Sequence, residues 1–172
     1  MTYAAAAIAR ADAGWYGDEL DLDGVEDLDG VVELLRETVG DDASTALLFV
    51  EEDDEWFAIL RVDSDDEPRV FVSDARVVAT SEIAGLFAEA AIEIDPEEDE
   101  PGEDETADDE DDEGTRADGD PVGDSALLSD LGTSSARLLG LCAEEGALPS
   151  DVISALCESA GCLDVLEKLR GV

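Results

Sequence analysis

The sequence predicts an α+β fold, with a five-stranded antiparallel sheet and two helices in the order strand, strand, helix, strand, strand, strand, helix. Short apolar runs between turn-forming residues predict the strands, and two segments with a helical apolar period predict the helices. A third observation sets the boundaries between the regions of the chain. Aspartate and glutamate dominate residues 95–121, so this segment has few apolar side chains to bury. We therefore expect an α+β domain at 1–92, an acidic disordered linker at 93–123 and a small α-helical region at 124–172.

The first two strands are predicted at residues 3–10 and 15–20, with a tight connection at Ala13 and Gly14. Alanines on both faces of the first strand suggest a close approach of covering helices, although an alanine run is also compatible with a helix. A helix follows, with Asp27 as its N-cap and Gly40 at its C-terminal end. Its apolar stripe consists of Leu28, Val31, Val32, Leu35 and Val39.

The continuous apolar run at 46–50 is expected for a central strand that is covered on both faces. The next strand, at 56–62, alternates, so its side chains divide between two faces. One face carries Trp56, Ala58, Leu60 and Val62, and the other carries Phe57, Ile59 and Arg61. The turn between these two strands is acidic and consists of Glu51, Glu52, Asp53, Asp54 and Glu55.

A fifth strand is predicted at 69–73, and a second helix begins near Thr80 or Ser81. The apolar positions of this helix are Ile83, Leu86, Phe87 and Ala90. Beyond the linker, leucines at helical spacing predict three or four short helices, one of which is capped by Ser150 or Asp151 and separated from the next by Gly161. A helical unit of this size is marginally stable alone, so it must pack on the first domain, on a partner or on another copy.

The charge of the chain limits its classes of partner. It has 49 Asp and Glu against nine Lys and Arg, which gives a formal net charge of −40. Such a surface repels the phosphates of DNA and RNA, so direct nucleic-acid binding is disfavoured. The same field attracts a basic protein partner, and salt weakens the attraction. The alternative is that the charge only keeps the chain soluble or reflects a salty cytoplasm.

The residue types also limit the chemistry. No histidine is present, which removes the commonest general base and most zinc sites. Cys142, Cys157 and Cys162 lie in a leucine-rich helical pattern and are expected to be reduced core thiols. The sequence has no glycine-rich phosphate loop. We therefore expect a non-enzymatic protein with no catalytic residue, no metal and no cofactor.

The opening segment MTYAAAAIAR predicts a cytoplasmic protein without membrane contact. It has no basic stretch before its apolar run and is too short to span a bilayer or to serve as a signal peptide.

Four segments of the chain form a recognisable set: YAAAAIARADAGW, VEDLDGVVELLR, FVEEDDEWFAILRVDSDDEPRVFVSDA and SDLGTSSARLLGLCAEEGALPSDVISAL. Together they resemble the actinobacterial family of tRNA adenosine deaminase-associated proteins. The family name comes from the position of its genes beside the gene for the tRNA-editing deaminase, and the resemblance implies no catalytic residues. The chain also lacks the H-x-E and P-C-x-x-C pattern of the deaminase itself.

Charge and resemblance together predict an accessory protein that binds a basic partner, with the tRNA adenosine deaminase as the best candidate. In this hypothesis Glu51, Glu52, Asp53, Asp54 and Glu55 steer the partner, and Trp56 serves as an anchor. Two other functions stay open. In the first, the chain senses a small unknown ligand in a pocket between the sheet and its helices. In the second, the chain is an enzyme that uses carboxylates alone, one of which is a buried acid with a raised pKa.

Overall fold

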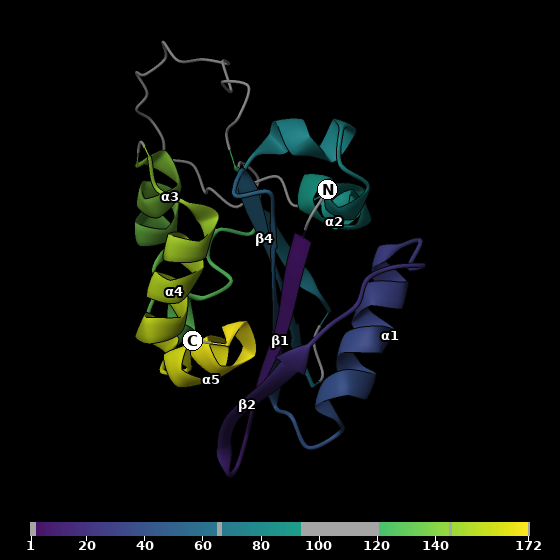
Figure 1. The fold of residues 1–172 in the computed structure, drawn as a ribbon, viewed down its shortest axis with the longest axis vertical. Coiled ribbons are helices and arrows are strands. Elements are labelled where there is room, and N and C mark those ends of the chain that lie inside the picture. Colours follow the sequence, from purple (N-terminus) through teal and green to yellow (C-terminus); the bar gives the residue numbers. More distant parts are fainter. Residues whose placement is uncertain (1–2, 65–66, 94–120, 145, 172) are drawn as a thin grey trace, which may run out of the picture.

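The computed structural model describes residues 3–64, 67–93, 121–144 and 146–171 (Figure 1). Most of the predicted linker, at 94–120, lies outside these residues. The strands are β1 (Tyr3–Ala11), β2 (Gly14–Glu19), β3 (Thr45–Glu52), β4 (Trp56–Asp63), β5 (Arg69–Val72) and β6 (Val122–Gly123). The α-helices are α1 (Leu28–Val39), α2 (Glu82–Glu93), α3 (Ser135–Ala143), α4 (Pro149–Ala160) and α5 (Leu163–Arg170). Two 3-10 helices, η1 (Ala75–Ala79) and η3 (Ser129–Leu131), complete the described elements.

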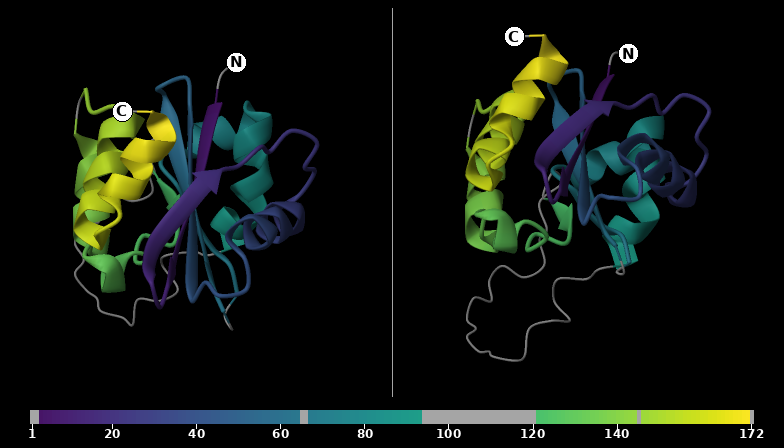
Figure 2. Two further views of the ribbon diagram at one scale, coloured as in Figure 1. Left: turned by 60° about the horizontal axis from the view of Figure 1, so that its bottom comes forward. Right: turned by 90° about the horizontal axis from the view of Figure 1, so that it is seen from below.

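The described strands form one antiparallel sheet in the order β2-β1-β3-β4-β5-β6. Helices α1 and α2 cover one face, and α3, α4 and α5 cover the other, which gives three layers (Figure 2). The predicted α+β class and antiparallel sheet are confirmed, but the sheet has six strands in place of the predicted five.

The sixth strand, β6, is too short to show a pattern in the sequence. Its two residues, Val122 and Gly123, pair with Val72 and Phe71 at the sheet edge. Gly123 has a φ of 104°, and a Cβ placed there would lie 2.2 Å from the carbonyl oxygen of Val70. Only glycine fits this close approach, so the strand depends on a residue that sequence patterns associate with turns.

The layer of α1 and α2 agrees with the predicted pattern. Four residues of the predicted α1 stripe are buried, and Leu28 is partly buried. Asp27 is the N-cap, because its side chain accepts a hydrogen bond from the Gly30 N–H at 2.9 Å. Gly40 ends the helix with a φ of 86°. In the second helix Phe87 is buried, whereas the side chain of Ala90 lies outside the described part of the chain.

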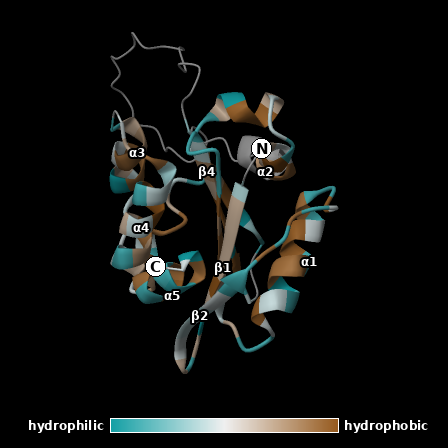
Figure 3. Cartoon of the chain, viewed as in Figure 1, coloured by the Kyte–Doolittle hydropathy of each residue, from teal (hydrophilic) through white to brown (hydrophobic). Residues whose placement is uncertain are grey.

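The C-terminal helices bury the second face of the sheet. Strand β4 divides its side chains as predicted, with Trp56 and Leu60 in the α1–α2 layer and Phe57 and Ile59 toward α3–α5. The apolar residues of this second layer are Ile8, Leu47, Phe49, Phe57, Ile59 and Phe71 from the sheet and Leu127, Leu128, Leu138, Ile153, Leu156 and Leu166 from the C-terminal segment. Figure 3 shows hydrophobic residues on both helical layers and on the strands between them.

The N-terminal end of α4 differs from the prediction, and its C-terminal end agrees with it. The helix begins at Pro149 with Leu148 as its N-cap, so the prediction of Ser150 or Asp151 as the cap is wrong. Proline suits the first helical position, since its fixed φ is helical and its missing N–H needs no partner there. Gly161 ends the helix as predicted, with its own N–H and that of Cys162 donating to the Cys157 carbonyl at 2.9 Å.

The three cysteines are free thiols, as the sequence predicts. Cys157 and Cys162 are buried in the second apolar layer, and Cys142 is half-buried at its edge. Burial raises the pKa of Cys142 to about 12.

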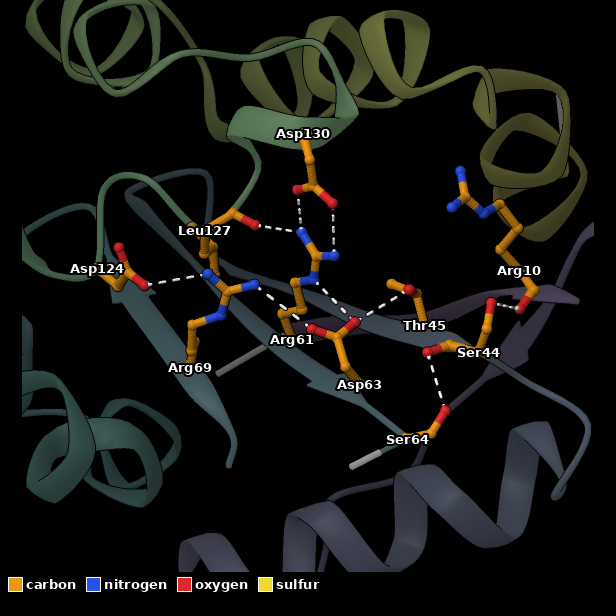
Figure 4. Close-up of polar contacts among 10 residues, drawn as sticks. All are labelled: Arg10, Ser44, Thr45, Arg61, Asp63, Ser64, Arg69, Asp124, Leu127 and Asp130. Carbon is orange, nitrogen blue, oxygen red and sulfur yellow. Dashed lines mark hydrogen bonds and ion pairs between the residues drawn. The ribbon is translucent and has the colours of Figure 1, made fainter. Parts of the chain in front are cut away.

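Arg61 fastens the C-terminal segment to the sheet (Figure 4). Its side chain is 5% exposed and donates to both carboxylate oxygens of Asp130, at 2.6 and 2.9 Å. It also donates to the Leu127 carbonyl at 2.6 Å and to Asp63 at 3.1 Å. A buried guanidinium requires such partners, because removing it from water without them costs several kcal/mol. Arg69 adds a second tie, at 3.7 Å from Asp124.

The substitution Asp130→Asn should lower the free energy of unfolding at pH 7 by about 1 kcal/mol, because the pair is charge-assisted but Asp130 is 61% exposed. The hydrogen bond from Arg61 lowers the pKa of Asp130 below its ordinary value of 3.8. The stabilising effect of the Arg61–Asp130 pair is therefore present above pH 3.8, and it is lost as the pH falls through the lowered pKa of Asp130. Urea unfolding of both proteins at a series of pH values measures this.

Exposed Asp42 provides the matched control, since the described residues give it no ion pair. The substitution Asp42→Asn should leave the free energy of unfolding nearly unchanged at every pH. A constant difference between wild type and Asp130→Asn down to the lowest pH would contradict the role of the Arg61–Asp130 pair.

Candidate functional site

The acidic turn projects from the end of the β3–β4 hairpin. Glu52 and Trp56 form the last paired positions, and Asp53, Asp54 and Glu55 connect them. Asp53 and Asp54 have φ values of 53° and 59°, in the left-handed region that aspartate tolerates better than most residues. All three connecting residues are exposed. The backbone therefore holds three carboxylate side chains at the surface.

The base of this turn is buried and joined to α2. Glu52 and Trp56 are 5% and 2% exposed, and the Trp56 indole N–H donates to Glu52 Oε1 at 3.0 Å. The same oxygen accepts a hydrogen bond from Ser81 Oγ at 2.6 Å, and Ser81 Oγ accepts the Ala84 N–H at 3.2 Å. These bonds fix the hairpin to the first turn of α2. Trp56 lies in the apolar core in this conformation, away from the surface.

Glu51 lies on the opposite face of the sheet, because successive side chains of a strand alternate. Its carboxylate accepts a hydrogen bond from Arg170 Nη2 at 2.5 Å. Arg170 also donates to the Ser150 carbonyl at 3.3 Å and to Ser154 Oγ at 3.1 Å. Of the six residues that the sequence assigned to a partner site, three are therefore exposed at the turn, and three hold the hairpin to its neighbours.

A groove of about 760 Å³ opens beside Glu51, between the sheet and helices α4 and α5. Its apolar lining includes Ala4, Ala6, Phe49, Ile153, Leu166 and Leu169. Its polar edge includes Tyr3, Glu19, Asp21, Glu51 and Arg170. The strand register places the residues of the groove floor side by side, because Ala4 pairs with Glu51 and Ala6 pairs with both Phe49 and Glu19.

The short side chains of β1 explain where the groove lies. On the α1–α2 face Ala5, Ala7 and Ala9 are buried, so the predicted close approach of a covering layer is confirmed there. On the other face Ala4 is exposed and Ala6 is half-buried along the groove. The same prediction is wrong for Ala4, because the C-terminal helices do not close over it, whereas Ala6 still packs against the second apolar layer.

The edge of the groove is negatively charged. Tyr3 donates its hydroxyl proton to Asp21 Oδ1 at 3.2 Å, and its oxygen accepts the Leu22 N–H at 2.8 Å. Burial raises the pKa of Tyr3, and the negative charges of Asp23 and Asp21 raise it further. Among the described lining residues, Glu19, Asp21 and Glu51 outnumber the single cation, Arg170. The groove therefore favours a cationic group over an anionic one.

Other chemical features of the site are few. Within the residues that the structure describes, no group of three or more Cys, Asp or Glu side chains is placed to hold a metal ion. The pKa of Asp74 is lowered, chiefly by its hydrogen bond from Arg76. Among the described helices, none has the length and apolar character needed to cross a membrane.

No sequence pattern located the groove or indicated the roles of Ser81 and Arg170. Serine at position 81 indicates only a helix start, whereas its bond to Glu52 joins residues 29 positions apart. Arg170 and Glu51 are separated by 119 positions, and no local pattern relates them.

Comparisons with known proteins identify the family. Searches among curated proteins and among solved structures find no significant match. The family model of Rv3753c-like tRNA adenosine deaminase-associated proteins matches residues 3–163, which include all the described strands, the acidic turn and the groove lining except Leu166, Leu169 and Arg170. This match confirms the resemblance seen in the sequence. The chain therefore belongs to the Rv3753c-like tRNA adenosine deaminase-associated protein family.

Proposed function

We propose that this protein is a non-enzymatic cytoplasmic accessory protein that binds tRNA adenosine deaminase through its acidic surface. The observation that carries the proposal is membership of a family described by its association with that enzyme. The net charge of −40 supports it. An enzyme that binds tRNA presents Lys and Arg to phosphates, and an acidic protein complements such a surface.

The acidic turn is the part of the described surface best suited to this role. Asp53, Asp54 and Glu55 are exposed, and the buried Glu52 and Trp56 hold their backbone in place. Fixed carboxylates raise the rate of encounter with a basic partner, and salt screens the effect over about 10 Å at 0.1 M. The turn would therefore act mainly on the association rate.

The acidic surface disfavours direct binding of nucleic acid. Carboxylates exceed cations 49 to nine. Several of the described arginines are already paired with carboxylates, among them Arg61, Arg69, Arg76 and Arg170. A phosphate backbone would meet a repulsive surface with few cations to contact it.

One observation favours a second function, the sensing of a small ligand. The groove of about 760 Å³ has the size of typical ligand sites and lies between the sheet and the C-terminal helices. A bound ligand raises the melting temperature by mass action, so a thermal-shift screen of metabolites tests this alternative.

Removing the turn charges should weaken the complex with the deaminase. In the triple variant Asp53→Asn, Asp54→Asn, Glu55→Gln, we expect about five- to tenfold weaker binding at low salt, mainly through slower association. Asparagine also tolerates a left-handed φ, so the backbone should persist. Surface plasmon resonance at a series of salt concentrations gives both rates, and the difference from wild type should shrink as salt rises.

A matched control removes the same charge elsewhere. Glu26, Glu33 and Glu37 are exposed in or just before α1, and changing all three to glutamine should alter binding by less than about twofold. Equal losses in both triple variants would show that only total charge matters. Absence of a wild-type complex at low and high salt would refute the proposed function.

A substitution of Trp56 tests whether this residue supports the turn or anchors a partner. The substitution Trp56→Phe removes a donor to buried Glu52 and should lower the free energy of unfolding by about 1–3 kcal/mol. The affinity of the folded variant for the deaminase should change little, because the side chain is 2% exposed. Denaturant unfolding and binding assays measure the two effects. Unchanged stability with a large loss of affinity would instead identify Trp56 as an anchor.

A further inference from the structure

We propose that the groove between β1 and α5 receives a basic side chain of the deaminase, an arginine or a lysine. The inference rests on the proposed function and adds a specific contact to the steering by the acidic turn. It follows from three properties of the groove: its apolar floor, its acidic edge and the guanidinium that the chain itself already places there.

The floor of the groove suits the aliphatic part of a long basic side chain. Ala4, Ala6 and Phe49 form it from neighbouring positions of β1 and β3, and Leu169 lies on the helical side. Arginine and lysine place their methylene groups on apolar surface and keep the charged end in a polar environment. A volume of about 760 Å³ exceeds what one such side chain fills, so neighbouring partner residues can enter as well.

The edge of the groove supplies the charge that a cation requires. No cation of the described residues forms an ion pair with Glu19 or Asp21. Both carboxylates line the groove, on the side of β2. A guanidinium placed there would replace water with charge-assisted hydrogen bonds. An anionic ligand would instead meet three carboxylates, and Arg170 is the only counter-charge among the lining residues that the structure describes.

Arg170 shows that this edge accepts a guanidinium. Its Nη2 lies 2.5 Å from the carboxylate of Glu51, and its Nη1 donates to the Ser150 carbonyl and to Ser154 Oγ. Glu51 is thus neutralised by the chain itself. Glu19 and Asp21 are left as the carboxylates that a partner's cation would contact.

The first test fills the groove. Ala4 is exposed in a paired strand, where phenylalanine is well accepted, so Ala4→Phe should fold and obstruct the floor. We expect it to bind the deaminase about tenfold more weakly than wild type. Ala136→Phe, on an exposed position of α3 outside the groove lining, is the matched control and should bind within about twofold of wild type.

The second test removes the charge without changing the shape. The double variant Glu19→Gln, Asp21→Asn should weaken binding by about five- to tenfold. The control Glu33→Gln, Glu37→Gln removes the same charge from α1 and should have less than about a twofold effect. Circular dichroism melts of all four variants establish that they are folded.

The outcomes separate this inference from the proposed function. Wild-type affinity in both Ala4→Phe and the double variant would overturn the groove contact, while the wild-type complex would still support the accessory role. Stabilisation of the free protein by agmatine, together with normal deaminase binding by Ala4→Phe, would assign the groove to a free amine and also overturn the inference. Failure of the wild-type protein to form any complex with the deaminase would overturn both the groove contact and the proposed function.

Discussion

The structure depends on the burial of the central strands on both faces. Nearly every residue of β3 and β4 is buried, and α1 and α2 cover only one side of them. Without the C-terminal helices, Leu47, Phe49, Phe57, Ile59 and Phe71 would form a contiguous exposed patch. Burial of each such side chain contributes about 1.5–3 kcal/mol, which explains why a helical segment too small to be stable alone packs there. Arg61 fixes its position through Asp130 and Leu127.

Incomplete cover by this helical layer creates the site. The helices close over Ile8 but not over Ala4, so the groove opens at one end of β1. The β3–β4 turn begins at the same end of the sheet, because Tyr3 of β1 pairs with Glu52 of β3. Glu51 faces the groove, Glu52 faces the core, and Asp53 begins the exposed turn. Three consecutive carboxylates thus have three different environments, which the alternation of a strand and its turn imposes.

Local patterns in the sequence predicted those features that depend on local physics. Alternation in β4 placed Trp56 on the same face as Leu60 and so predicted that Trp56 is buried. A partner anchor has to be exposed, so this pattern already argued against the anchor role. Asp27 was predictable because an N-cap acts within three residues. Strand β6 was missed because two residues carry no period, and the Leu148 cap was missed because it makes no side-chain hydrogen bond. The groove and the Arg61–Asp130 pair arise from packing of distant segments, and such contacts leave no mark at short spacing.

The central claim is that the deaminase engages the end of the sheet where the acidic turn and the groove adjoin. Hydrogen–deuterium exchange of the wild-type protein, with and without purified deaminase, tests this claim most directly, because it maps contacts without altering a residue. We expect slower exchange in the enzyme's presence at residues 53–57, at the start of β1 and in the last turn of α5. Unchanged exchange at all three places, or protection confined to α1 and α2, would contradict the claim.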